Sequence, residues 1–322
     1  MRRIAQKLLT GSLRLRILAK MRTFAKIPIM KIALYSRPEI IHHPEELSGF
    51  IRVLDQYDIL YSANTEFAGI IARHTGHQLP DERIYGPTPP EGIEMIISYG
   101  GDGTFLDTVR LLNTRPVPVL GINYGHLGFL ANVSKENIAD AIRDIAEGKY
   151  TVEERLLLQV EGDFDRPLEY PYAFNEFSLQ KKGIAMASVE VYINGELVTN
   201  FQGDGLILSS PTGSTAYSLS VGGPILAPNC NSFVLAPIAS HNLTMRPLVV
   251  PDNSEMRFRV VSRTGDAIVT LDSRDYLVHS ESSFTVKKAK KSAFLVKLQN
   301  ISFYRTLRDK MMWGLDSRSL KG

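Results

Sequence analysis

The sequence contains very little cysteine and no long apolar run. Its 322 residues include a single cysteine, Cys230, so no disulfide can form within one chain, and we predict a reducing compartment, the cytoplasm. No run of about 18 apolar residues is present, so no membrane-spanning helix is expected. Cysteine and histidine are not spaced for zinc, and we predict no metal-ligating residues. Disulfide-stapled, membrane-spanning and zinc-binding proteins are therefore disfavoured classes.

Acidic residues are missing from the first segment of the chain. Residues 1–29 hold eight Lys or Arg and no acid, so they carry +8, while the whole chain carries +3 and the remainder 3 − 8 = −5. A nucleic-acid-binding body is therefore not expected. The extension fits a targeting peptide, a membrane-surface helix, or upstream sequence read through from an early start. We favour the last, with Met30 as the first native residue, because an apolar run follows it directly.

From Met30 onward, short apolar runs alternate with helical periodicity. We predict strands at 31–36, 59–61, 94–98 and 117–122, and helices at 45–56, 67–72, 103–112 and 135–147. Strands that alternate with helices are typical of a doubly wound, mainly parallel sheet. Residues 30–150 are therefore predicted to form an α/β domain.

From residue 151 the helical patterns give way to strands. We predict strands at 156–161, 172–179, 188–193, 206–209, 257–262, 267–271 and 283–286. Residues 151–290 are therefore expected to form an all-β domain. A strand at 293–298 and a helix-like segment at 302–313 follow, and we expect this tail, residues 291–322, to return to the α/β domain and pack on it.

A glycine-rich turn follows the third predicted strand of the first half. The turn is Gly100-Gly101-Asp102-Gly103-Thr104, and a helix pattern begins within it. Glycines let the backbone approach a ligand closely, and the N–H groups at a helix start attract phosphate. The lysine of a Walker A loop and the spacing of a dinucleotide fingerprint are both absent. Asp102 would therefore hold a metal or accept a proton, or it would only cap the helix.

Two further motifs follow in order. The second is Asn175-Glu176, and the third is GDGLILSSPTGSTAYSLSVGGP at residues 203–224. Together the three motifs resemble the NAD kinase family, from about Met30 to the C-terminus. The glycine turn alone is weakly specific because diacylglycerol, sphingosine and 6-phosphofructo-kinases share it, whereas the third motif is highly specific.

The resemblance implies a role for each matching residue. Asp102 is similar to the catalytic acid–base residue beside the adenosine ribose of NAD. The implied phosphate loop consists of Gly100, Gly101, Gly103 and Thr104. The implied contacts to the ribose, the adenine and the rest of the dinucleotide are Phe129, Asn175, Glu176, Thr215, Ala216, Tyr217, Ser218, Leu219 and Ser220. The implied contacts at the nicotinamide end are Asp204 and Ala239, and in this family the aspartate commonly acts across a subunit boundary.

The implied reaction moves the γ-phosphoryl group of ATP to the 2′-hydroxyl of the adenosine ribose of NAD and gives NADP. Mg²⁺ or another divalent metal would arrive with ATP, and a homodimer or homotetramer is implied. The chain departs from the family at Gln202 and at Ala185-Met186, where some members carry arginine. NADP feedback and a preference between NAD and NADH are therefore not carried over.

Two other functions stay open at this point. A lipid kinase of the diacylglycerol or sphingosine type would share the fold and the glycine turn, but the third motif argues against it. A dinucleotide-binding regulator without turnover would have no need of Asp102 or of Asn175-Glu176, and all three residues are present.

Overall fold

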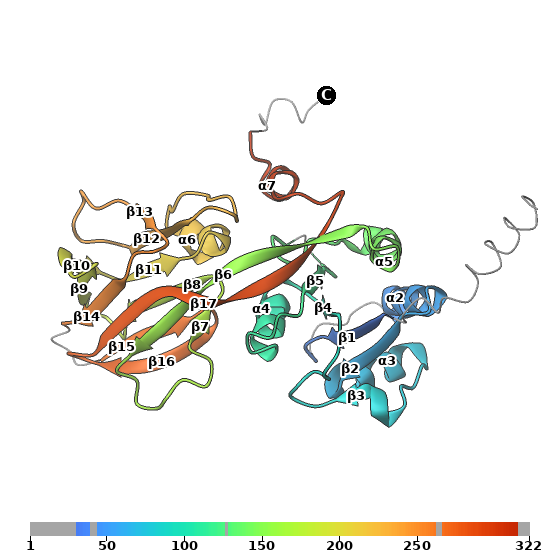
Figure 1. The fold of residues 1–322 in the computed structure, drawn as a ribbon. Helices are drawn as coiled ribbons and strands as arrows, with labels where there is room; N and C mark the ends of the chain where they lie inside the picture. Colours follow the sequence, from blue (N-terminus) through green and yellow to red (C-terminus); the bar gives the residue numbers. More distant parts are fainter. Residues whose placement is uncertain (1–29, 39–43, 126–127, 262–265, 315–322) are drawn as a thin grey trace, which may run out of the picture.

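The computed structural model describes residues 30–38, 44–125, 128–261 and 266–314 (Figure 1). The predicted basic extension, residues 1–29, lies outside these residues. No helix in the described part of the chain is long and apolar enough to cross a membrane.

The first half is a parallel sheet with helices on both faces. The strand order is β3–β2–β1–β4–β5, and every neighbouring pair is parallel. The strands are β1 (Lys31–Tyr35), β2 (Leu60–Asn64), β3 (Ile84–Tyr85), β4 (Met95–Tyr99) and β5 (Val119–Ile122). The helices are α2 (Pro44–Gln56), α3 (Thr65–Thr75), α4 (Asp102–Leu111) and α5 (Ile138–Ala146).

Alternating side chains of the strands explain why the sheet is covered twice. In β1, Ile32 and Leu34 pack in one core with α2, α3 and α5, whereas Ala33 packs in a second core with α4. All five residues of β4 are buried, as expected for a central parallel strand that is covered on both faces. The predicted doubly wound α/β domain is confirmed.

The second half consists of two packed antiparallel layers. One sheet has the order β13–β12–β11–β8–β15–β16, and the other layer contains β10, β9, β14 and parts of β17 and β6. The strands are β7 (Tyr172–Ala173), β8 (Glu176–Lys181), β9 (Ala187–Ile193), β10 (Glu196–Gly203), β11 (Gly205–Ser209), β12 (Ser232–Ile238), β13 (Leu248–Pro251), β14 (Met256–Val260), β15 (Asp266–Leu271) and β16 (Arg274–His279). One apolar core lies between the layers and includes Phe177, Phe258 and Phe284. The predicted all-β domain is therefore present.

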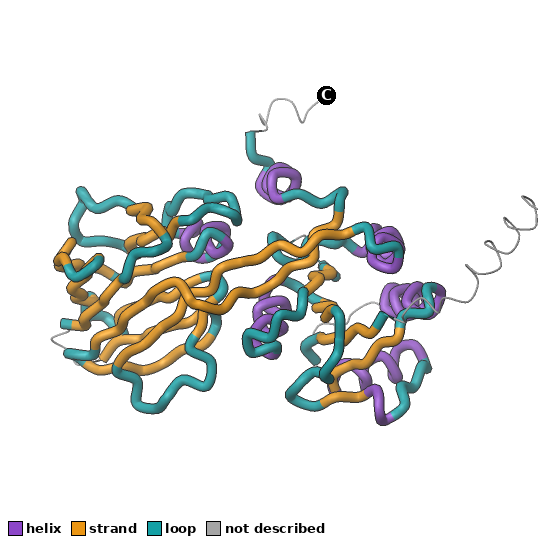
Figure 2. The backbone as a smooth tube through the Cα atoms, in the orientation of Figure 1, coloured by secondary structure: helices purple, strands orange, loops and turns teal. Residues whose placement is uncertain are grey.

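Two long strands join the halves. Strand β6 (Tyr150–Gly162) pairs with β17 (Ser283–Leu298) along nearly its whole length, and Figure 2 shows both crossing from one half to the other. Near its end, β17 also pairs in parallel with β5, through Leu295 and Val119, and Leu298 enters the core of the α/β domain. Residues 295–298 thus return to the α/β domain, whereas residues 315–322 of the predicted tail lie outside the described residues. The strands predicted at 283–286 and 293–298 are one strand, which runs without a break through residues 290 and 291.

Several elements differ from the sequence prediction. Strands β10, β12, β13 and β16 were not predicted; β10 is mostly exposed and β12 contains a proline, so neither has a clear strand pattern. The strand predicted at 172–179 is interrupted between Ala173 and Glu176. The backbone N–H groups of Phe174 and Asn175 there bind the carboxylate of Asp272, not a neighbouring strand. The interruption lies in the second motif and shapes the candidate site.

Candidate active site

The glycine turn connects the buried strand β4 to helix α4. Helix α4 begins at Asp102, and a side chain at Gly100 would place its Cβ 2.4 Å from Thr104 Oγ1, so only glycine fits there. Thr104 itself is buried, and its hydroxyl has no hydrogen-bond partner among the described residues. The turn is therefore tightly folded on itself, and its role as a phosphate loop stays a prediction.

The Asp102 carboxylate binds a loop that follows β5. Its Oδ2 accepts the N–H of Phe129 at 3.0 Å, and its Oδ1 accepts those of Leu130 and Ala131 at 3.1 and 2.9 Å. A Cβ on Gly128 would lie 2.0 Å from Asp102 Oδ1, so this glycine is what lets the loop approach. The side chain is thus directed at the loop.

Asn175 and Glu176 are positioned by a second aspartate. Asp272 accepts the N–H groups of Phe174, Asn175 and Glu176, at 2.9, 2.7 and 3.3 Å. The sequence analysis did not identify Asp272, which lies 98 residues beyond Phe174. Burial raises the pKa of Asp272 in spite of these hydrogen bonds, so the amide groups offset a cost of burial.

Glu176 is a buried carboxyl with unused hydrogen-bonding capacity. Burial, with a further contribution from the charge of Asp272, raises the pKa of Glu176 to about 8, and a backbone hydrogen bond from Tyr217 opposes the rise. Its Oε2 has no partner among the described residues. At neutral pH Glu176 therefore carries a proton most of the time, and it can donate as well as accept.

The third motif packs directly on the second. The N–H of Ser210 donates to the Asn175 carbonyl at 2.8 Å, and a Cβ on Gly213 would lie 2.1 Å from the same oxygen. The turn η3 (Thr212–Thr215) and the short helix α6 (Tyr217–Ser220) follow, and the Tyr217 side chain is 36% exposed. The structure thus brings together the predicted residues 215–220 and Glu176, although Ser218 is fully buried.

Asp204 and Ala239 lie at the other end of the same sheet. The N–H of Asp204 donates to the carbonyl of Ile238, beside Ala239, and its carboxylate pairs with Lys181 at 2.6 Å. Glu176 is paired with Ser209, five residues along β11, which is a separation of roughly 17 Å at about 3.4 Å per residue. The structure therefore groups these two residues with each other and apart from Glu176.

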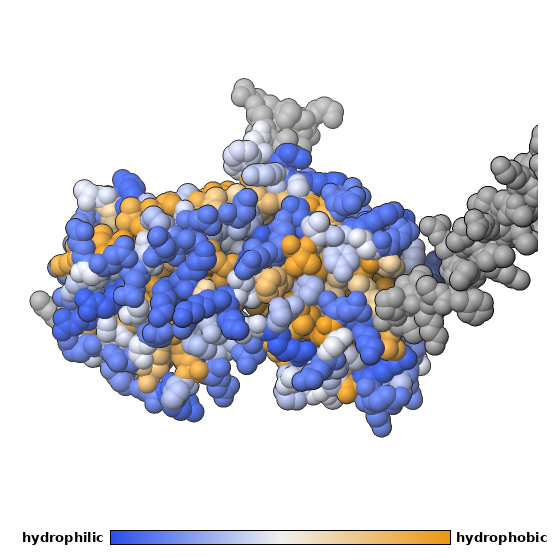
Figure 3. All heavy atoms as spheres, in the orientation of Figure 1, coloured by the Kyte–Doolittle hydropathy of each residue, from blue (hydrophilic) through white to orange (hydrophobic). Residues whose placement is uncertain are grey.

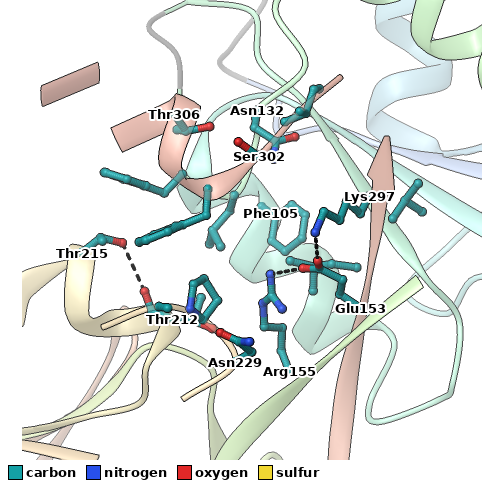
Figure 4. Close-up of a pocket in the computed structure, with 18 of the residues that line it drawn as sticks. Phe105, Asn132, Glu153, Arg155, Thr212, Thr215, Asn229, Lys297, Ser302 and Thr306 are labelled. Carbon is teal, nitrogen blue, oxygen red and sulfur yellow. Dashed lines mark hydrogen bonds and ion pairs between the residues drawn. The ribbon is translucent and has the colours of Figure 1, made fainter. Parts of the chain in front are cut away.

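A cavity of about 220 Å³ opens between the two halves of the molecule (Figure 4). Of the predicted residues, Phe129 lines it from the α/β side and Thr215 from the β side. Figure 4 shows Thr212 and Thr215 at one side and Ser302 and Thr306 across from them. Within the described ranges, no residue of the first motif lines the cavity, but the Phe129 loop, which does, also binds Asp102. The surface around the two halves mixes polar and apolar residues (Figure 3).

One wall of the cavity carries a cluster of three charged side chains. Glu153 accepts from Arg155 and from Lys297, each at 2.5 Å. Burial opposes the ionisation of Glu153, but the two cations outweigh it and lower its pKa. The Nε of Arg155 is buried and has no partner in the described part of the protein. With one anion between two cations, the wall favours an anionic ligand.

The last helix, α7 (Phe303–Met311), covers one side of the cavity. Ser302 caps it by accepting the N–H of Arg305, and the Phe303 ring lies 6.2 Å from the Phe129 ring. Lys310 Nζ lies 3.8 Å from Asp102 Oδ2. The sequence indicated a helix here and gave no signal of this contact.

Among the described residues, no group of three His, Cys, Asp or Glu side chains is arranged to hold a metal ion. Mg²⁺ is commonly bound by one or two carboxylates together with the phosphate oxygens of a substrate. A site with few carboxylates fits Mg²⁺ only when a bound triphosphate supplies the remaining oxygen ligands.

Comparison with known protein families divides the chain as its motifs do. Residues 73–150 match the ATP-NAD kinase N-terminal domain, and residues 174–298 match the ATP-NAD kinase C-terminal domain. Among curated relatives, the NAD kinase of Flavobacterium psychrophilum is 43% identical over 232 residues, which cover 71% of this chain and 79% of that protein. The NAD kinase of Christiangramia forsetii is 33% identical over 297 residues and covers 90% of this chain and 100% of its own.

Two solved structures are similar to the whole fold. A yeast NADH kinase complexed with NADH has a TM-score of 0.78 at 22% identity, and the match covers 90% of this chain and 89% of that one. An NAD kinase from Archaeoglobus fulgidus in complex with ATP has a TM-score of 0.68 at 25% identity, with coverage of 88% and 99%.

Proposed function

The chain belongs to the ATP-NAD kinase family, and on that premise we propose that ATP and NAD meet at the cavity between its two halves. The enzyme is an NAD kinase, which transfers the γ-phosphoryl group of ATP to the 2′-hydroxyl of the adenosine ribose and gives NADP. The family assignment favours this acceptor over the lipid that the glycine turn alone left open. The observation that carries the location is the cavity itself, which joins the Phe129 loop to Thr215.

Asp102 is proposed to handle the proton of the acceptor hydroxyl. Its Oδ1 accepts two backbone N–H groups and its Oδ2 only one, so Oδ2 keeps the greater capacity to accept a hydrogen bond from the acceptor hydroxyl. The three N–H groups fix the orientation of the carboxylate before the substrate arrives. A positioned base of this kind contributes roughly 10²- to 10⁴-fold to a rate.

The glycine turn is proposed to hold the triphosphate. Gly100, Gly101, Gly103 and Thr104 lie where the partial positive charge of the α4 N-terminus meets the end of β4. Phosphoryl transfer depends mainly on alignment and on stabilisation of charge, and backbone N–H groups supply both. Mg²⁺ enters bound to ATP as part of the substrate.

The adenosine of NAD is proposed to lie between Phe129 and the second and third motifs. A protonated Glu176 can donate to one ribose oxygen and accept from another hydroxyl, and Asn175 adds an amide with both capacities. Residues 215–220 would line the same side, with the partly exposed Tyr217 ring available for stacking.

We also propose that the enzyme acts as a homo-oligomer. Asp204 and Ala239 lie at the far end of β11 from Glu176, so they would serve the nicotinamide end in the site of a neighbouring subunit. Size-exclusion chromatography with light scattering measures the assembly. A mixture of the inactive variants Asp102→Asn and Asp204→Asn should regain activity only if one site uses both chains.

A direct assay tests the function. Purified protein with NAD, ATP and Mg²⁺ should form NADP, followed by a dehydrogenase that reduces NADP and not NAD. Parallel reactions with other nucleoside triphosphates or polyphosphate identify the donor, and reactions with NADH or diacylglycerol identify the acceptor. The absence of NADP at every pH from 6 to 9 would contradict the proposal.

A further inference from the structure

A lysine from the last described helix reaches the acid of the glycine turn. Lys310 Nζ lies 3.8 Å from Asp102 Oδ2 and 4.8 Å from the centroid of the Phe129 ring. The Lys310 and Asp102 side chains keep 36% and 33% of their surface exposed, so a ligand can reach both. The Lys310 ammonium therefore lies beside Oδ2, the Asp102 oxygen that accepts fewer backbone hydrogen bonds.

Packing of α7 places this lysine. Phe303, Thr306, Leu307 and Lys310 follow the spacing of one helix face. Thr306 and Leu307 are buried, 5% and 6% exposed, and the Phe303 ring packs against Phe129. The position of the ammonium is thus set by the helix and does not depend on the ion pair alone.

The glycine turn has no lysine of its own, although a phosphate loop usually needs one to neutralise the β- and γ-phosphates. A second cation, Arg37, lies nearby. Its Nε pairs with Asp107 at 2.5 Å, and its Nη2 donates to the Gly103 carbonyl at 3.1 Å. Arg37 is therefore occupied in holding the turn to its helix, whereas the contact of Lys310 is long and exposed.

We propose that Lys310 supplies a positive charge that the glycine turn lacks, and that this charge acts on the transferred phosphoryl group. This role rests on the proposed function of the cavity. The ammonium lies within reach of the group that Asp102 would meet, so it can attract the phosphoryl oxygens. Donors aimed at the charge of a transition state are worth roughly 10²- to 10³-fold each.

In the transfer step, one bond to the γ-phosphorus forms as another breaks. The ribose 2′-oxygen forms a bond to the γ-phosphorus while the bond from that phosphorus to the bridging oxygen breaks. The bridging oxygen leaves with the electron pair as part of ADP, and the hydroxyl proton passes to Asp102 and then to solvent. Lys310 binds the non-bridging oxygens of the group in transfer.

The test replaces the charge and keeps the length of the side chain. Lys310→Met should lower kcat by roughly 10²-fold while the KM for NAD changes less than about threefold. Lys310→Arg, which keeps the charge, should recover most of the loss. Arg308→Met is the matched control, because Arg308 is exposed on the same helix, and its kcat should stay near that of the wild type.

A second measurement does not depend on turnover. Inorganic triphosphate, titrated by calorimetry into the ligand-free protein, should bind about tenfold more weakly to Lys310→Met than to the wild type. A kcat near the wild-type value in Lys310→Met overturns the inference. A loss of kcat that Lys310→Arg does not recover, and that comes with a lower Tm, overturns it as well. If the inference on Lys310 fails but the wild type makes NADP, the proposed function still stands. If the wild type makes no NADP, the proposed function and the inference on Lys310 both fall.

Discussion

Asp102 and Asp272 are held in the same way and differ in what lies around them. Each accepts N–H groups from three consecutive residues of a distant segment, 129–131 for the first and 174–176 for the second. The Asp102 side chain is 33% exposed and has the Lys310 ammonium beside it. Asp272 lies in a tight turn with a φ of 54°, and burial raises its pKa.

The difference shows how one local arrangement serves two purposes. A carboxylate in a ring of amide groups is rigid, which suits a structural clamp and also a reacting group that must not move. The surroundings decide between the two, because Asp102 lies in the glycine turn beside the Lys310 ammonium, whereas Asp272 holds the buried residues 174–176. The comparison therefore predicts separate effects of mutation at the two positions.

The largest expected effect is on turnover at Asp102. Asp102→Asn keeps the shape and removes the proton acceptor, so kcat for NADP formation should fall at least about 10²-fold while NAD binding largely persists. Because an Asn side chain keeps one oxygen acceptor for the N–H groups of residues 129–131, the free energy of unfolding should fall by only about 1 kcal/mol. Steady-state kinetics and urea unfolding of the same preparation measure both. Near-wild-type turnover would remove Asp102 from the mechanism.

The next effect is on stability at Asp272. Asp272→Ala removes the acceptor from the N–H groups of the buried residues 174–176, so the free energy of unfolding should fall by about 2–3 kcal/mol in urea titrations. Asp275→Ala, an exposed aspartate near the same turn, should cost less than about 0.5 kcal/mol. If the two variants are equally stable, the clamp at residues 174–176 has no structural weight and the contrast with Asp102 fails.

The smallest expected effect is a pH dependence of stability that arises at Glu176, one of the residues that Asp272 holds. Its folded-state pKa, about 8, exceeds the usual 4.5, so the folded protein holds an extra proton between these pH values. The associated stability is complete below about pH 4.5 and is lost as the pH rises through 8. The Tm of ligand-free protein should therefore drop between pH 6.5 and 9 by about 2–4 °C more than that of Glu176→Gln.

Glu255→Gln, a change at an exposed position, serves as the control and should follow the wild-type curve. Parallel Tm curves for wild type and Glu176→Gln across this range would show that the buried carboxyl is not protonated in the folded state.

The elements that could be predicted are those whose own residues carry the signal. Strand β4 has three consecutive apolar residues at its centre, and α2 has buried residues at helical spacing, so local pattern was enough. Strand β10 has one buried apolar residue, Phe201, among exposed neighbours, and no pattern marked it. The continuity of β17 was hidden by its lysine-rich middle, which pairs with β6 across a register shift between Lys288 and Ser292.

The candidate site was predicted where a motif carries its own geometry. The glycine turn at 100–104 follows from short-range sequence, whereas the packing of Gly213 on Asn175 was not predicted. Asp272, Gly128 and Lys310 were missed because each acts on a residue far along the chain, through a contact that only the fold creates. The separation of Asp204 from Glu176 was likewise a matter of register along β11.

The late position of β17 in the chain has a consequence for synthesis. A ribosome releases β5 long before Leu295, its neighbour in the sheet, so one edge of the nascent α/β domain stays unpaired until the β domain has been made. Helix α7 emerges later still and completes the wall of the cavity. The growing chain therefore cannot complete the cavity before residues 303–306 have been made.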